Sequence, residues 1–177
     1  MGIVIIGVDE VINDFKKFVQ FNAKATRMAL NDKLQTAHND AVRNTKKTWT
    51  GMSVADMKKL TKLDKARDTQ LSVKFTLTST PIPLFKFGAT WDKSKKGASY
   101  KLLGRRKTLK GSFIAKNKKG QQQVYKKIKQ GTRNVTPLHS YTPSTMFTTS
   151  KSEDVFINNF LREFGKRYLH HIDRLTK

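Results

Sequence analysis

The sequence predicts an α+β fold: a long N-terminal helix and a short second helix, an antiparallel β-sheet with long basic hairpins, and a C-terminal helix. Three observations support this prediction. Apolar residues recur every three or four positions near both ends of the chain, and they alternate with polar residues over 70–79. Six glycines then follow at intervals of seven to eleven residues between positions 88 and 131, which is typical of hairpins. A chain of 177 residues, 37% of them hydrophobic, is long and apolar enough for a single domain over 1–177 with a real core.

Residues 8 to about 49 have the pattern of a helix. Val11, Phe15 and Phe18 fall on one face, and Ala25 and Ala29 extend it. A second, slightly rotated stripe continues through Leu30, Leu34, Ala37 and Ala41. The alanines predict close approach of another element, and Gly51 ends the helix. The pattern fits one long helix equally well as two helices broken near Asn22.

The first ten residues, MGIVIIGVDE, contain an apolar run that we interpret as a short strand. The run has no basic region before it and no small-residue cleavage site after it, and it is too short to be a signal peptide or to span a membrane. Ile6 stands where the myristoylation pattern requires Ser or Thr. We therefore expect a soluble protein without a membrane partner. The absence of cysteine excludes a disulfide framework, a thiolate nucleophile and a cysteine-based zinc site.

The segment SVADMKKLTKL predicts the second helix, since Ser53 and Asp56 have the spacing of a capping box. Alternation of apolar and polar residues predicts a half-buried strand over 70–79. Pro81 and Pro83 exclude the next segment from a central ladder position, so LFKFGA is expected to be an edge strand. Further short strands are expected at 98–103, 111–116 and 122–128, with the basic segments DKSKKG and NKKG as hairpin tips.

The C-terminal part divides into a loop and a helix. Residues 131–150 are expected to be an ordered loop held by Leu138, Tyr141 and Phe147, and Ser152 is a good N-cap for a helix over 151–177. The apolar stripe of this helix comprises Ile157, Leu161, Phe164, Tyr168, Ile172 and Leu175. Three heptads favour packing on the sheet or on the first helix over a free coiled coil. The remaining parts of the single domain are the helical segment 1–65 and the sheet with its basic hairpins, 70–130.

Charge is the most informative property of the chain, whose net charge is +23. Residues 86–133 contain 16 Lys and Arg against one acid, Asp92, and so carry most of the excess. A field of this strength attracts polyanions and steers association. The alternative is a solvated basic loop that only keeps the protein soluble, but the concentration of charge in one segment favours a partner.

The sequence contains little that predicts catalysis. His38 is expected on a helix surface, and the adjacent His170 and His171 point to different helix faces. The segment GRRKTLKG resembles a phosphate loop only in its glycine spacing, because it lacks the Gly-Lys-Ser/Thr ending and carries bulky side chains. We therefore predict no catalytic residues, no cofactor and no metal, and no enzymatic activity.

Nucleic-acid binding requires basic side chains and stacking aromatic rings, and residues 86–133 contain both. The candidate contacts to DNA or to a protein partner are Lys93, Lys95, Lys96, Arg105, Arg106, Lys107, Lys110, Lys116, Lys118 and Lys119. Among the aromatic residues, Phe85, Phe87 and Phe113 are more simply explained as core, and Tyr100 and Tyr125 as cross-strand partners. Binding through these residues would be to the phosphate backbone and independent of sequence.

Four segments in order resemble the minor tail protein Z family of tailed phages and prophages: PIPLFKFGA followed by a basic hairpin, GRRKTLKGSFIAK, GQQQVYKK, and NVTPLHSYTPSTMF. The resemblance covers residues 8–149, and its specific part is 81–147. One departure is that Thr142 stands where the family has the glycine of a Gly-Pro-Ser stretch.

The resemblance implies a tail-completion protein of the head–tail junction, which is a structural protein of the virion assembled in the cytoplasm of the host bacterium. It implies a homohexameric ring that contacts tail-tube, terminator or connector proteins and surrounds a channel for double-stranded DNA. In such a ring, long hairpins could complete the sheet of a neighbouring subunit. The candidate interface residues are Pro81, Pro83, Phe85, Phe87, Trp91, Tyr100 and Phe113. The alternative function is non-specific nucleic-acid binding through residues 86–133, in DNA packaging or on the ribosome.

Overall fold

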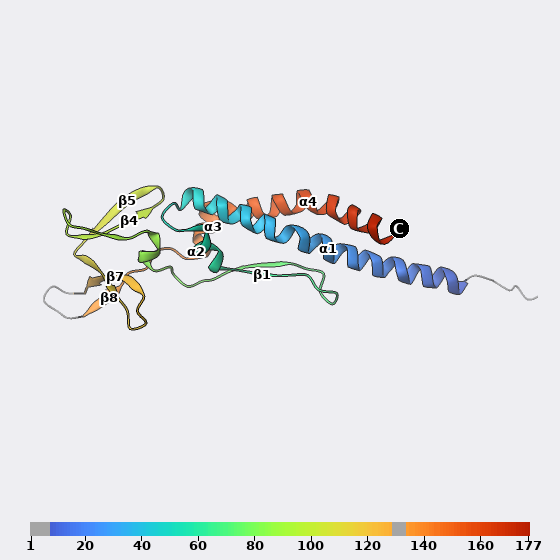
Figure 1. The fold of residues 1–177 in the computed structure, drawn as a ribbon, viewed down its shortest axis with the longest axis horizontal. Helices are drawn as coiled ribbons and strands as arrows, with labels where there is room; N and C mark the ends of the chain where they lie inside the picture. Colours follow the sequence, from blue (N-terminus) through green and yellow to red (C-terminus); the bar gives the residue numbers. More distant parts are fainter. Residues whose placement is uncertain (1–7, 129–133) are drawn as a thin grey trace, which may run out of the picture. The chain divides into compact units, whose positions relative to one another are not determined.

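The computed structural model describes residues 8–128 and 134–177, with the side chains of the first helix described from residue 16 onward. The fold is α+β, as predicted (Figure 1). The chain divides into two compact units, each built from segments that are distant in the sequence. The helical unit comprises Met1–His38, Leu63–Phe75 and Ile157–Lys177, and the sheet unit comprises Asn39–Lys62 and Thr76–Phe156. The strand expected over 1–7, and the side chains of Val11 and Phe15, lie outside the described residues.

Helix α1, Val8–Thr48, is continuous, so there is no break near Asn22. The alanines predicted to allow close approach are buried: Ala25 and Ala29 in the helical unit and Ala41 in the sheet unit. The helix ends before Gly51, as expected, but the glycine serves a packing role. A Cβ at Gly51 would lie 2.1 Å from the backbone oxygen of Lys101, which leaves no room for any side chain.

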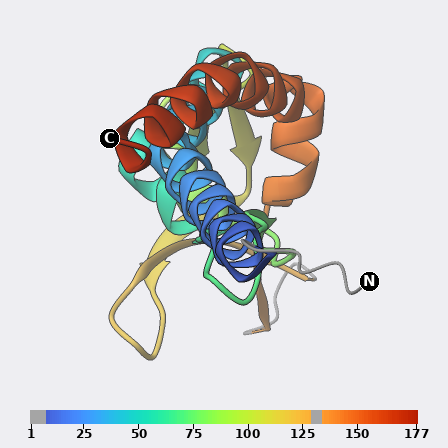
Figure 2. The same ribbon diagram turned by 90° about the vertical axis from the view of Figure 1, so that its right-hand side faces the viewer.

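Helix α4, Ser152–Leu175, packs along α1, which confirms one of the two expected arrangements. In the helical unit, the two helices lie side by side in both views (Figure 1 and Figure 2). The Tyr168 hydroxyl donates to the side-chain oxygen of Asn22. The Nε2 atom of buried His171 lies 2.9 Å from a carboxylate oxygen of Asp32. Polar contacts therefore fix the register of two helices that approach through small residues.

The predicted stripe of α4 was only partly right. Phe160 and His171 are buried, and Phe164 and Tyr168 are partly buried, but Ile157 and Leu161 are exposed. The buried line runs through Phe156, Phe160, Phe164, Tyr168 and Ile172 at a constant spacing of four. This spacing fits a helix that crosses its neighbour and does not fit the alternating four-and-three spacing of a coiled coil. Ser152 is the first residue of the helix, and its buried hydroxyl accepts from the side chains of Asn44 and Thr45.

A two-stranded antiparallel ribbon is formed by β1, Thr61–Asp64, and β2, Lys74–Leu77, and its connecting loop packs on α1. The Asn31 side chain donates to the Ala66 oxygen at 3.0 Å and accepts from the Ala66 nitrogen at 2.9 Å. The alternation predicted for 70–79 holds over β2, but the strand is shorter than expected. The prediction of a surface His38 was wrong. His38 is buried edge-on against Phe75, with ring centroids 5.6 Å apart, because the ribbon covers that face of α1.

The core of the sheet unit is built around Trp49. Its ring lies 6.4 Å from that of Phe87 and 5.0 Å from that of Tyr141, and its indole nitrogen donates to the Met146 oxygen. Other fully buried side chains of this unit are Met52, Met57, Ile82 and Phe147, and a separate cluster is formed by Leu84, Ala89, Ala98 and Val124. Helix α2, Val54–Lys59, begins as predicted, because the Ser53 hydroxyl accepts from the Asp56 nitrogen.

The edge strand predicted for LFKFGA is wrong, since residues Leu84–Phe87 form a 3₁₀ helix, η1. Leu84 and Phe87 are both buried, and a 3₁₀ helix places residues three apart on the same side, whereas a strand would place them on opposite faces. The residues just before η1 do pair on one side only. The Ile82 and Leu84 nitrogens donate to the oxygens of Tyr141 and Leu138. The intervening prolines keep the other side free of ladder bonds, as the sequence predicts.

Residues 134–149, expected as a loop, contain strand β8, Val135–Pro137, and helix α3, Pro143–Thr149. Thr142, which replaces the family's glycine, is the N-cap of α3 with φ −77°, and its hydroxyl accepts from the Thr145 nitrogen. The substitution is thus compatible with the local geometry, because a Thr at an N-cap satisfies one of the free helix N–H groups.

Two three-stranded antiparallel sheets complete the sheet unit. One has the order β3–β4–β5, with β3 Thr90–Asp92, β4 Gly97–Leu102 and β5 Arg105–Lys110. The other has the order β6–β7–β8, with β6 Ser112–Lys116 and β7 Gln122–Lys127. The strands expected at 98–103, 111–116 and 122–128 are confirmed as β4, β6 and β7. Strands β1, β3, β5 and β8 and helix α3 were not predicted.

Candidate functional site

The β3–β4–β5 sheet has two chemically different faces. Ala98, Tyr100 and Leu102 alternate on the face that packs toward the core, where Ala98 is fully buried. The opposite face contains Ser99, Lys101 and their cross-strand partners Thr108 and Arg106. Because successive side chains of a strand point to opposite faces, one face of this sheet is apolar and the other is basic and rich in hydroxyl groups.

Arg106 is held in a fixed position on this outer face. Its Nε donates to the Ser99 hydroxyl at 2.8 Å, and one terminal nitrogen donates to the Thr90 hydroxyl. Both acceptors are neutral and Arg106 forms no ion pair among the described residues, and Asp92 lines the same hollow as its guanidinium. The position is preorganised for binding an anion such as a phosphate or carboxylate.

Asp92, the single acid of residues 86–133, accepts hydrogen bonds from the turn that follows it. It accepts from the Ser94 hydroxyl at 2.7 Å and from the Lys95 nitrogen at 3.2 Å. The Ser94 hydrogen bond, followed by that from Lys95 and the charge of Lys95, lowers the pKa of Asp92 below its ordinary value. Asp92 thus stabilises the β3–β4 turn and forms no ion pair with the ten predicted basic residues among the described residues.

The ten predicted basic residues are all exposed, and none forms an ion pair with an acid among the described residues. They do not form one patch. Lys93, Lys95 and Lys96 lie in the β3–β4 turn, and Lys110 is at the same end of the sheet, because it pairs with Gly97. Arg105 begins β5 at the opposite end. Arg106 and Lys107 follow Arg105 in β5, and the remaining three are Lys116, at the end of β6, and Lys118 and Lys119, in the turn that follows.

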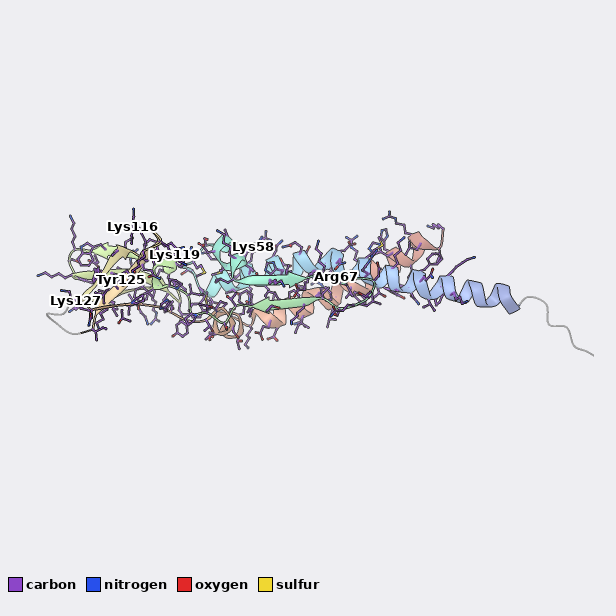
Figure 3. The ribbon with its side chains drawn as sticks, turned by 90° about the horizontal axis from the view of Figure 1, so that it is seen from below. Lys58, Arg67, Lys116, Lys119, Tyr125 and Lys127 are labelled. Carbon is purple, nitrogen blue, oxygen red and sulfur yellow. The ribbon has the colours of Figure 1, made fainter. Side chains whose placement is uncertain are left out.

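The outer face of the β6–β7–β8 sheet combines aromatic rings with a lysine. Phe113 and Tyr125 are cross-strand partners with rings stacked 5.9 Å apart, whereas Tyr100 pairs with Lys107 in the other sheet, so the two tyrosines do not pair with each other and Phe113 is a partly buried surface residue. Figure 3 shows Tyr125 on this sheet together with Lys127, which lies two residues further along β7 and therefore on the same face, whereas Lys116 alternates to the opposite face of β6. Stacked rings beside a lysine are the parts that a nucleic-acid backbone and its bases require.

A groove of about 480 Å³ lies between the β4–β5 hairpin and the segment that follows β8. Its walls are mostly apolar, and Lys107 contributes the single formal positive charge; the lining comprises Leu84, Tyr100, Leu102, Lys107, Leu109, Leu138, His139, Ser140 and Tyr141. Tyr100, expected as an interface residue, therefore lines a concave surface. Tyr100, Leu102 and Leu109 are surrounded by lysines and arginines in the sequence, so the sequence pattern did not predict that they share an apolar surface.

The other interface candidates differ in accessibility. Trp91 is 49% exposed on the edge strand β3, and Pro81 is also exposed. Pro83, Phe85 and Phe113 are partly buried. Phe87 has no exposed surface, so it belongs to the core and its side chain is not presented to a partner.

Leu103 was not predicted as a functional residue. It forms the β4–β5 turn with Gly104, both with positive φ, 48° for Leu103 and 77° for Gly104. A leucine in the left-handed region is strained, and this side chain is nevertheless 43% exposed. The left-handed conformation of both residues is what a two-residue hairpin turn requires, because its twist then matches that of the flanking strands. The Leu-Gly pair after the ASYKLL strand was the signal for this turn.

No group of three or more potential metal ligands occurs among the residues that the structure describes. In the same residues, no helix combines the length and the apolar character needed to cross a membrane.

The family model described as prophage minor tail protein Z (GPZ) matches residues 5–158 of the 177. No curated protein and no solved structure matches the chain. The matched region contains all of the basic segment and both of its sheets. This family implies a location in the virion and suggests a role that is not enzymatic. The chain belongs to the prophage minor tail protein Z family and is a structural protein of a phage tail.

Proposed function

We propose that this protein completes the phage tail at its head-proximal end, where a ring of its copies joins tail to head and lets DNA pass. Family membership supports a tail role. The observation that carries the finer proposal is the set of ten exposed cations without carboxylate partners in the described part of the chain. Such a surface is suited to anionic partners, either acidic patches on neighbouring neck proteins or the DNA backbone.

The edge strands of the two sheets also support the proposal. Strands β3, β5, β6 and β8 are all edge strands, each paired on one side only within their sheets. Edge strands are templates for pairing with another chain, and the lysines and arginines on β5 discourage indiscriminate pairing. A homohexamer closed by such contacts, together with tail-tube, terminator or connector proteins, is the assembly that we propose. It forms in the cytoplasm of the host bacterium.

The test is complementation of a phage that lacks this gene. Arg105→Glu with Lys107→Glu, and Lys118→Glu with Lys119→Glu, should yield tails that do not join heads, seen by electron microscopy as separate heads and tails. The matched control is Lys58→Glu with Arg67→Glu, which changes charge equally on exposed residues outside residues 86–133 (Figure 3). Full infectivity of both segment variants, or absence of the protein from purified virions, would refute the proposal.

A second candidate function, non-specific nucleic-acid binding, is favoured by the stacked Phe113–Tyr125 pair beside Lys127. The logarithm of the affinity for duplex DNA should then fall with the logarithm of salt concentration by about 0.9 for each phosphate neutralised. Removing two phosphate contacts with Lys118→Glu and Lys119→Glu should reduce this slope by about 2. An unchanged slope would remove nucleic acid as the partner of these lysines and leave the protein-contact function intact.

A further inference from the structure

A hollow of about 440 Å³ lies beside the β3–β4 turn. Three of the residues that line it are basic and one is acidic, so the lining carries a net formal charge of +2. The lining comprises Thr90, Trp91, Asp92, Lys93, Ser94, Lys95, Ser99 and Arg106. A concave surface with a net positive charge is suited to an anion.

Arg106 presents one edge of its guanidinium group to a ligand. Its Nε and Nη2 donate to the hydroxyls of Ser99 and Thr90. These two nitrogens lie on the same edge of the planar group, so the hydrogens of Nη1 and one hydrogen of Nη2 remain, and no acceptor in the described part of the chain takes them. Ser99 is only 3% exposed, so this anchor is part of the sheet and is in place before any ligand binds.

The acid in the hollow is held by other donors. Asp92 accepts from two groups of its own turn and, at 3.4 Å, from the Thr108 hydroxyl. Thr90 accepts from Arg106 and keeps its own hydroxyl hydrogen for an acceptor in the hollow. An anion at this position would therefore receive hydrogen bonds from both the guanidinium and the Thr90 hydroxyl.

More cations follow on the same face of the sheet. Strand register places Lys101 opposite Arg106, and strand alternation places Lys110 on this face four residues further along β5. Both lysines are exposed. Arg106 and Lys110 are about 14 Å apart along the strand, because each residue advances a strand by about 3.4 Å. A single carboxylate cannot contact both, whereas a chain of repeated phosphates can.

We propose that this face binds the phosphate backbone of double-stranded DNA, with one phosphate held by Arg106 and Thr90. A tetrahedral phosphate offers oxygens to the guanidinium and to the hydroxyl together, and neighbouring phosphates reach Lys101 and Lys110. Such binding is independent of base sequence. The inference rests on the proposed passage of DNA through the tail, and it assigns the DNA contact to one face of the β3–β4–β5 sheet.

The test measures the affinity of the protein for a short DNA duplex of arbitrary sequence at several salt concentrations. Arg106→Gln should weaken binding about 10-fold at low salt, as expected for loss of a charged hydrogen bond. It should also reduce the slope of log affinity against log salt by about 0.9, which corresponds to one phosphate.

Arg105→Gln is the matched control, because Arg105 is also exposed on β5 and alternates to the opposite face. It should change the affinity and the slope far less than Arg106→Gln does. Equal effects of the two variants would show that only net charge matters and would overturn the site.

Arg106→Lys separates the charge from the geometry. It should restore the salt slope, because the charge returns. It should recover only part of the affinity, because an ammonium group does not reproduce the planar fork that donates to two hydroxyls and a phosphate. Full recovery of the affinity would contradict a site built on the anchors at Ser99 and Thr90.

Trp91 reports on binding, because it lines the hollow and is 49% exposed, whereas the other tryptophan, Trp49, is buried. Its fluorescence should change on titration with the duplex, and Trp91→Phe should remove the change. Poly-glutamate is the carboxylate probe and should give a weaker response that Arg106→Gln does not alter. No change at saturating DNA, or a poly-glutamate response that is equally strong and lost in Arg106→Gln, would refute the proposal.

The DNA site and the tail function can fail separately. If Arg106→Gln binds DNA normally while the charge-reversal variants above still leave heads and tails unjoined, the DNA site is refuted and the tail function stands. If purified virions lack the protein but Arg106→Gln weakens DNA binding as expected, the tail function is refuted and the DNA site stands.

Discussion

The helical unit packs through small buried residues, whereas the sheet unit packs through large ones. In the helical unit, Ala25 and Ala29 are fully buried, and the polar pairs Asn22–Tyr168 and Asp32–His171 set the register. The sheet unit instead fills its core with large side chains around Trp49. Small residues allow close approach but bury little area per side chain, whereas aromatic residues bury much more. The stability of the helical unit therefore depends on small side chains between its helices, and that of the sheet unit depends on large side chains in its core.

The exposed surfaces of the two units also differ in their chemistry. The helical unit exposes apolar side chains such as Leu161 and Leu169, while the sheet unit exposes cations without carboxylate partners in the described part of the chain. The first surface is apolar and the second is cationic, so the two units differ in the chemistry that they present to solvent.

The largest effect is expected from removing bulk in the sheet unit. Phe87→Ala should lower the free energy of unfolding by about 3–5 kcal/mol, because a fully buried ring against Trp49 is lost. Urea denaturation followed by circular dichroism would measure it. Trp91→Ala, on an exposed edge strand, is the control and should change stability far less. Similar losses for both would contradict the division between core and surface aromatic residues.

Introducing a larger side chain into the helical unit should cause the next largest loss of stability. Ala29→Leu is expected to destabilise by about 1–3 kcal/mol, since a fully buried alanine leaves no space for three more carbons. The same denaturation experiment applies, with Lys24→Leu on the exposed side of α1 as the control. A stabilising Ala29→Leu would mean that α1 is not packed through its alanines.

A smaller effect of opposite sign is expected at the β4–β5 turn. Leu103→Asn should stabilise the subunit by up to about 1 kcal/mol, because asparagine tolerates the left-handed conformation that Leu103 adopts. If the exposed leucine serves assembly, the same variant should join tails to heads less well. Leu109→Asn, which lies outside the turn, should show no such gain. Loss of stability in Leu103→Asn would show that the turn is not strained.

The smallest effect concerns Asp56 and depends on pH. Hydrogen bonds from Lys86, at 2.9 Å, and from Ser53 lower the pKa of Asp56 below its ordinary value of 3.8. The contribution to stability is therefore present above pH 3.8 and is lost as the pH falls through the lower pKa of the folded state.

Lys86→Met should accordingly destabilise by a few tenths to about 1 kcal/mol at neutral pH, since the pair is partly exposed. Thermal melts across pH would show this difference shrinking below pH 3.8. Lys58→Met, on the same helix as Asp56, should show no pH-dependent difference. A Lys86→Met effect that is constant with pH would exclude the ion pair as its cause.

Much of the fold could be predicted because local patterns were strong. The helical character of α1, though not its continuity past Asn22, follows from periodicity and turn residues alone, as do the Ser53 cap of α2 and strands β4, β6 and β7. The predictions for His38 and for the η1 segment failed, because a ribbon distant in the sequence covers the first and an i, i+3 burial pattern determines the second. Strand β5 was missed because five of its six residues are polar or charged, which hides its alternation.

The ten basic residues of the candidate site were predicted from charge alone, and their exposure follows from the cost of burying unpaired cations. Their division among three hairpin ends could not be predicted, because strand register determines which ends meet. The same applies to the groove around Tyr100, whose walls come from segments almost 40 residues apart.

Composition and periodicity by themselves thus determined the α+β class, the concentration of charge and the close approach expected of an alanine-rich helix, while the resemblance of four segments indicated the family. Tertiary structure alone decided which apolar residues stay exposed. Ile157 and Leu161 were expected to pack, but α4 crosses α1 along a line spaced by four and leaves them outside. A helix offers several overlapping apolar ridges, and only the position of its neighbour selects the one that is buried.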